Sequence, residues 1–99
     1  MRRDLPIHTQ LVQTAHATLE LGLQLKEEKK PKETSYLILL DAKDQDHLKE
    51  IACYLDELDI EHHIFFEPDL PINGFTAICS EPLPLEKRKH FKKFKLWKI

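Results

Sequence analysis

Helical and strand-like hydrophobic patterns alternate along this 99-residue chain, and that alternation limits its fold more than any other feature. The most regular pattern lies within residues 44–60. Its apolar residues recur at the spacing of one helix face: Leu48, Ile51, Ala52, Leu55 and Leu58. Asp44 or Asp46 is placed to cap the first turn. We therefore predict a helix here.

The remaining patterns predict two more helices and three strands. A first helix runs from residue 8 to about residue 25, and a short last helix runs from residue 85 to about residue 94. The run SYLILL at 35–40 is typical of a strand that is buried on both faces. HHIFFE at 62–67 and GFTAIC at 74–79 are rich in β-branched and aromatic residues, which predicts two strands paired as a hairpin.

The resulting order, αβαββα, predicts an α/β sandwich of two or three layers in which helices cover a mixed sheet. Strand 35–40, the following helix and strand 62–67 would form a right-handed βαβ unit with parallel strands. The length and the 41% hydrophobic content suit a single domain that spans residues 1–99. Because no apolar run could cross a bilayer or serve as a signal peptide, we expect a cytoplasmic protein without a membrane partner.

The first helix carries polar residues close to its apolar side. A narrow polar stripe is formed by Thr9, Gln13, His16 and Glu20. The apolar stripe that we expect to face the core is formed by Val12, Ala15, Leu19 and Leu23. Polar groups at such an edge are either hydrogen-bonded structure or the wall of a site, and the pattern leaves both interpretations open for Gln13 and His16.

Positive charge is concentrated at the C-terminus, although the net charge is −2. Seven of the 15 basic residues lie in the last thirteen positions: Lys87, Arg88, Lys89, Lys92, Lys93, Lys95 and Lys98. They form either a solvated terminal element or a surface for a polyanion.

Metal and cysteine chemistry are not indicated. His62 and His63 are adjacent, so on a strand they point to opposite faces and cannot share one ion. Cys53 and Cys79 are too few for a disulfide framework or a zinc knuckle, and we expect two buried free thiols. We expect no metal and no cofactor.

The stretch RRDLPIHTQLVQTAHA at 2–17 resembles the opening motif of the type II peptidyl-tRNA hydrolases. In that motif an apolar strand leads into Arg-x-Asp-Leu, then Gly-Lys, then a helix bearing Gln-x-Ala-His-Ala. The residues that match are Arg3, Asp4, Leu5, Gln13, Ala15, His16 and Ala17. ELDIEHHIFFEPD and GFTAICSEPL resemble later parts of the family, in which Thr76 matches a threonine near the active site. The resemblance implies an enzyme that hydrolyses the ester between a peptide and tRNA.

The resemblance also implies which residues form the site. The catalytic group would consist of Gln13, His16, Thr76 and an acid, which is Glu67, or Asp69 if the alignment shifts. Ester hydrolysis needs a group that orients or deprotonates water, a donor to the oxyanion, and cationic surface for the tRNA phosphates. The residues expected to contact RNA are Thr9, Arg3, Lys87, Arg88, Lys92 and Lys93.

Two departures from the family bear on catalysis and on the start of the sheet. Thr9 stands where the family has its lysine, and His8 stands where it has glycine. The strand that precedes the motif in the family is missing, so we expect either a start codon further upstream or a strand supplied by the second copy of a homodimer. The sequence therefore leaves three functions open: an active hydrolase, a catalytically inactive relative that binds tRNA or protein, and a ligand-binding α/β domain unrelated to RNA.

Overall fold

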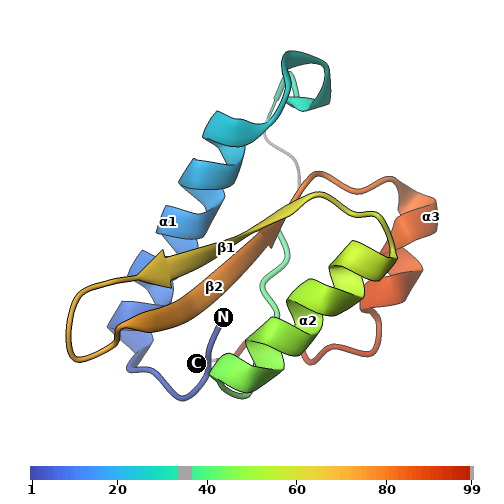
Figure 1. Ribbon diagram of the computed structural model, residues 1–99. Helices are drawn as coiled ribbons and strands as arrows, with labels where there is room; N and C mark the ends of the chain where they lie inside the picture. Colours follow the sequence, from blue (N-terminus) through green and yellow to red (C-terminus); the bar gives the residue numbers. More distant parts are fainter. Residues whose placement is uncertain (34–36, 99) are drawn as a thin grey trace.

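An antiparallel hairpin lies between two long helices in the computed structural model, which describes residues 1–33 and 37–98 (Figure 1). The helices and strands are α1 (Ile7–Gln24), η1 (Glu27–Lys29), α2 (Gln45–Glu57), β1 (His62–Glu67), β2 (Gly74–Ser80), α3 (Leu85–Arg88) and η2 (Lys89–Phe91). The described part of the chain is thus a small mixed α/β protein whose named strands form a two-stranded antiparallel sheet.

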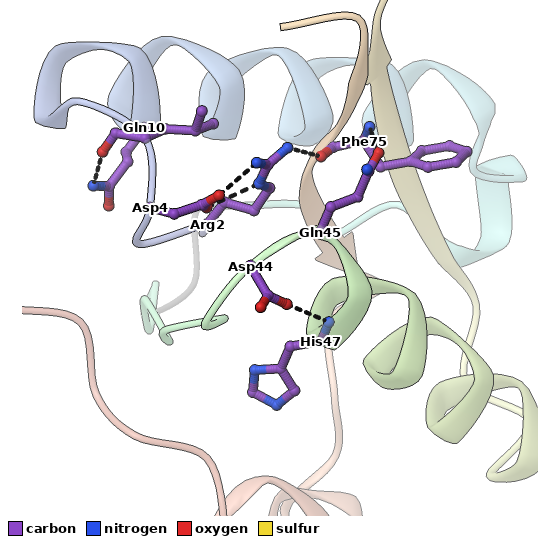
Figure 2. A network of polar contacts seen from close by, with 8 residues as sticks. Arg2, Asp4, Gln10, Asp44, Gln45, His47 and Phe75 are labelled. Atoms are coloured by element: carbon purple, nitrogen blue, oxygen red, sulfur yellow. Dashed lines mark hydrogen bonds and ion pairs between the residues drawn. The ribbon is translucent and has the colours of Figure 1, made fainter.

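Four of the predicted elements are confirmed, two helices and two strands. α1 covers nearly the whole range predicted for the first helix. α2 begins after Asp44, whose carboxylate accepts a 2.9 Å hydrogen bond from the backbone N–H of His47 and so caps the helix (Figure 2). β1 and β2 pair as the expected hairpin.

The predicted central strand at 35–40 is not formed at its described positions. Residues 35 and 36 lie outside the described residues, and Leu37 and Ile38 are 70% and 60% exposed rather than buried. Leu40 makes one antiparallel bridge, to Leu96. The predicted parallel pairing of this segment with 62–67 is therefore wrong for the described part of the chain, where β1 pairs with β2.

Residues 39–42 form backbone hydrogen bonds with the two ends of the chain. Ala42 forms a parallel bridge with Arg2, in which the N–H of Ala42 donates to Met1 O at 2.7 Å and the N–H of Arg3 donates to Ala42 O at 2.8 Å. On the other side, the N–H of Asp41 donates to Lys95 O at 2.8 Å. Segments 1–3 and 95–97 thus flank residues 39–42, and the termini lie side by side (Figure 1).

The face that α1 buries differs from the predicted one. Its buried residues are Gln10, Gln13, Ala17 and Leu21. Three members of the predicted core stripe, Val12, Leu19 and Leu23, are instead 51%, 66% and 74% exposed. The physical reason is that the amides of Gln10 and Gln13 find hydrogen-bond partners within the protein, which removes the main penalty for burying them.

The last helix is shorter than the predicted range of 85–94. α3 ends at Arg88 and continues as the single 3-10 turn η2. The chain is extended from residue 95 because Lys95 O and the N–H of Trp97 are both hydrogen-bonded to residues 39–41. An α-helix cannot offer these groups to a neighbouring strand, so helical structure stops before them.

Candidate functional site

A β-bulge at Thr76 directs its side chain toward α1. In the hairpin Phe65 pairs with Ala77 and Phe66 pairs with Phe75, so Thr76 has no residue opposite it. A bulge interrupts the alternation of side chains between the two faces of a sheet. As a result both Thr76 and Ala77 face the helix: Thr76 contacts Gln13, and Ala77 belongs to the same buried cluster as Ala17.

Gln13 connects Thr76 to Glu67 through its side-chain amide. Thr76 Oγ1 donates to Gln13 Oε1 at 2.8 Å, and Gln13 Nε2 donates to Glu67 Oε1 at 3.3 Å. Gln13 and Thr76 are 4% and 1% exposed, whereas Glu67 is half-buried at the end of β1. The structure therefore brings together three of the residues that the resemblance placed in the site.

One carboxylate oxygen of Glu67 is not used in this line of hydrogen bonds. Glu67 Oε1 accepts from Gln13, and Oε2 accepts no hydrogen bond from the described residues. A half-buried carboxylate held in this way can orient or deprotonate a water molecule. The hydroxyl of Thr76 and the amide oxygen of Gln13 are used in their hydrogen bond to each other. These two residues therefore act on a water molecule by positioning Glu67.

His16 and Asp69 do not join this group. The His16 side chain is exposed, and its ring packs against the Phe65 ring with 4.9 Å between centroids. Asp69 is exposed in the connection between β1 and β2, where its backbone carbonyl accepts a 3.0 Å hydrogen bond from Asn73. Of the two acids that the sequence offered, Glu67 is the one that contacts Gln13.

The first turn of α1 has His8 as its one ionisable side chain. Thr9, at the lysine position of the family, is half-buried, and the first turn contains no lysine or arginine. A cation does contact the residue that precedes Thr76: Arg2 Nη1 donates to Phe75 O at 2.9 Å. Figure 2 shows this guanidinium between Phe75 and Asp4, which it also contacts at 2.6 and 3.0 Å.

The Arg2–Asp4 pair was not singled out by the sequence analysis. Hydrogen bonding to Arg2 lowers the pKa of the Asp4 carboxyl, and the same contact raises the pKa of Arg2. The signal that could have found it is the Arg-x-Asp-Leu motif itself, whose arginine falls on Arg2 and not on Arg3. Residues 3 and 4 form a turn, which is closed by a 3.4 Å hydrogen bond from the N–H of Leu5 to Arg2 O.

The basic residues predicted to contact RNA lie apart from Glu67. Arg3 forms a 2.8 Å ion pair with Asp41, and Lys93 Nζ lies 3.5 Å from the centre of the Tyr54 ring on α2. Of the others, Lys87 is half-buried, and Arg88 and Lys92 are exposed around α3 and η2. In the part of the chain that the structure describes, none of these cations forms a hydrogen bond with Gln13, Glu67 or Thr76.

An open cleft of about 750 Å³ lies beside α2 and was missed by the sequence analysis. Its walls come from the N-terminal segment, residues 41–43, α2 and residues 93–95, and include Arg3, Asp41, Lys43, His47, Tyr54 and Lys95. Because these residues come from four separate segments, no local sequence motif predicts the cleft.

The described residues contain no group of three or more His, Cys, Asp or Glu side chains that could hold a metal ion. His62 and His63 point to different partners, Ile60 O and Glu20 Oε2. Cys53 and Cys79 are free thiols, but the prediction that both are buried is wrong because Cys53, on the outer side of α2, is exposed. Burial raises the pKa of the half-buried Cys79 thiol.

Comparisons with family models, with curated proteins and with solved structures found no match for this chain. Within residues 1–33 and 37–98, none of the helices combines the length and the apolar character that a membrane crossing requires.

Proposed function

We propose that this chain is a peptidyl-tRNA hydrolase-like protein of the cytoplasm, with its site at Gln13, Glu67 and Thr76. The observation that supports this proposal is the line of hydrogen bonds from Thr76 through Gln13 to Glu67. Gln13 is far in the sequence from Glu67 and Thr76, and the family resemblance names all three as site residues. The proposal includes the family's α/β sandwich, with tRNA or peptidyl-tRNA as the partner.

In this proposal Glu67 is the catalytic residue. Its carboxylate orients the attacking water and accepts a proton as water adds to the ester carbonyl. Gln13 and Thr76 are positioning residues, because they act on Glu67 through hydrogen bonds. His16, one turn further along α1 and exposed, is placed to contact the substrate rather than Glu67.

A second candidate function is an inactive relative that binds tRNA, and a specific observation favours it. The polar groups of Gln13 and Thr76 satisfy each other in a nearly water-free setting, as purely structural groups do. Arg2 is committed to Asp4 and Phe75 O, so it does not replace the cation that the family carries at position 9.

Hydrolysis of diacetyl-lysyl-tRNA tests the first candidate against the second. The parent protein should release the diacetyl-lysyl group, and Glu67→Gln should lower kcat/KM by about 100-fold or more, since loss of a general base costs about 10² to 10⁴ in rate. Glu67→Gln keeps an oxygen that can accept from Gln13. Glu28→Gln is the matched control because Glu28 is an exposed acid on η1.

Binding of uncharged tRNA at several salt concentrations completes the test. No turnover by the parent, together with tRNA affinity that falls steeply with salt, would establish the binding module. Absence of both turnover and tRNA binding would contradict both candidates.

A further inference from the structure

The cleft beside α2 opens at the carboxyl ends of two parallel segments. Arg2 and Ala42 form the parallel bridge, and the residues that follow them, Arg3 and Lys43, line the cleft. None of Gln13, Glu67 and Thr76 lines this cleft, so it is separate from the site proposed above.

The acidic residues of the cleft are mostly neutralised from within the protein. Asp4 pairs with Arg2 at 2.6 Å, and Asp41 pairs with Arg3 at 2.8 Å. Glu50 is the lining carboxylate that forms no ion pair with the described residues. The acids therefore leave little net negative charge in the cleft.

Three lysines supply positive charge to the same cleft. Lys43, Lys93 and Lys95 line it, and none forms an ion pair with a carboxylate in residues 1–33 or 37–98. Lys93 Nζ lies over the Tyr54 ring at 3.5 Å, a cation–π contact that holds one ammonium group at the wall. An excess of cations on converging walls favours an anionic ligand.

His47 adds a directed hydrogen-bond donor. Its Nδ1 accepts a 2.8 Å hydrogen bond from the backbone N–H of Lys43, which in the neutral ring places the proton on Nε2. Nε2 is therefore a donor on a ring whose orientation is fixed. The backbone N–H of His47 is already used by Asp44, so the donor to a ligand is the ring and not the helix end (Figure 2).

The remaining wall is apolar. Ile51, Tyr54 and Phe94 line the cleft, and the Tyr54 and Phe94 rings meet edge to face at 5.9 Å. The volume of about 750 Å³ lies within the range of small-molecule sites, which combine apolar walls with a few placed polar groups. We propose that the cleft binds a small organic phosphate of nucleotide size, with the phosphate at Lys43, His47 and Lys95 and the organic part on the Ile51–Phe94 wall.

Calorimetric titration of the full chain with adenosine 5′-monophosphate tests this inference, with adenosine and inorganic phosphate as partial ligands. The nucleotide should bind at one site, and each partial ligand should bind at least about tenfold more weakly. Adenosine lacks the charge-assisted hydrogen bonds of the phosphate, and inorganic phosphate lacks the burial of apolar surface on the Ile51–Phe94 wall. Lys43→Gln and Lys95→Gln should each weaken binding by about tenfold. Lys49→Gln is the matched control, since Lys49 lies on α2 outside the cleft, near the Phe75 ring.

Three results would overturn the inference: no saturable nucleotide binding, equal affinity for inorganic phosphate and nucleotide, or a loss in Lys49→Gln as large as that in Lys43→Gln. The Gln13→Ala variant should bind the nucleotide like the parent, since Gln13 does not line the cleft. Loss of hydrolysis with retained nucleotide binding would thus concern the proposed function alone. Shifts of the His47 ring signals in NMR spectra on addition of nucleotide would locate the bound phosphate at this histidine.

Discussion

Thr76 and Gln13, 63 positions apart in the sequence, meet in a buried 2.8 Å hydrogen bond that ties β2 to α1. The bond depends on the bulge in the hairpin, without which Thr76 and Ala77 would point to opposite faces. It also fixes the amide of Gln13, whose nitrogen is then directed at Glu67. Its removal should therefore affect both stability and the geometry of the proposed site.

Thr76→Val should lower the free energy of unfolding by about 1–3 kcal/mol, because Gln13 Oε1 would remain buried without a donor. Thr76→Ser keeps the hydroxyl and should cost only about 1 kcal/mol for the lost methyl group. Urea unfolding of both variants measures the difference. Thr18→Val, at an exposed position of α1, should change stability by no more than about 0.5 kcal/mol. Equal losses in Thr76→Val and Thr76→Ser would show that the hydrogen bond contributes nothing.

The two glycines should respond to alanine in opposite directions. At Gly74 a Cβ would lie 2.6 Å from Gln45 Oε1, which accepts a hydrogen bond from Phe75 N, so Gly74→Ala should cost about 1–3 kcal/mol. At Gly22 a Cβ meets nothing within 4 Å, and Gly22→Ala on α1 should stabilise by about 0.5–1 kcal/mol. Thermal unfolding of the two variants checks this. A stabilising Gly74→Ala would contradict the close approach of α2 to β2.

Asp4 should make stability depend on pH under acidic conditions. Because hydrogen bonds from Arg2 lower the pKa of Asp4 in the folded state, its contribution is present above the unfolded value of about 3.9 and is lost as pH falls through the folded value. Asp4 is 39% exposed, so Asp4→Asn should cost at most about 1 kcal/mol at neutral pH.

The measurement is urea unfolding of the parent and Asp4→Asn at neutral pH and below about pH 3, where the gap between them should narrow. Asp69→Asn serves as the control, because the exposed Asp69 forms no ion pair with the described residues. A difference in unfolding free energy between the parent and Asp4→Asn that grows in acid would contradict the lowered pKa of Asp4.

The two thiols should differ in reactivity. Thiolate is the reactive form, and Cys53 is exposed whereas burial raises the pKa of Cys79. Iodoacetamide should therefore alkylate Cys53 faster than Cys79, by on the order of tenfold, in the folded protein. Mass spectrometry of the native protein gives the two rates, and urea should make them similar. Similar rates without urea would mean that Cys79 is more accessible than the fold allows.

The elements best predicted from the sequence are those whose local signals agree. For α2, periodicity and the Asp44 cap point to the same helix, and for the hairpin two β-rich runs flank a Pro- and Gly-containing turn. The strand at 35–40 was predicted from an apolar run alone. Such a run indicates only that burial of its residues would be favourable, and it does not predict which strand they pair with.

The buried face of α1 shows why polarity alone misplaces a core. The spacing of apolar residues predicts that Val12, Leu19 and Leu23 face the core, yet the helix buries Gln10 and Gln13. Each glutamine finds a partner in a distant segment: Gln10 accepts a hydrogen bond from Trp97, and Gln13 contacts Thr76 and Glu67. Gln10 also donates to Leu5 O, just before α1. The spacing of the two glutamines, i and i+3, places them on one helix face. The hydrogen bonds that offset the cost of burying them depend on tertiary contacts, which the local sequence does not specify.

Part of the candidate site was accessible from sequence and part was not. Gln13, Glu67 and Thr76 came from resemblance, and the structure joins them by hydrogen bonds. His16 and Asp69 lie outside this group because one is exposed on α1 and the other lies on a loop.

Single-turnover release of diacetyl-lysine from diacetyl-lysyl-tRNA, by the parent and by Glu67→Gln at matched concentrations, tests the central claim most directly. A rate for the parent well above the spontaneous rate, reduced by about 100-fold or more in Glu67→Gln and unchanged in Glu28→Gln, is the predicted result. Equal rates for the parent and Glu67→Gln, with both proteins folded, would contradict the assignment of the Thr76–Gln13–Glu67 group as a hydrolytic site.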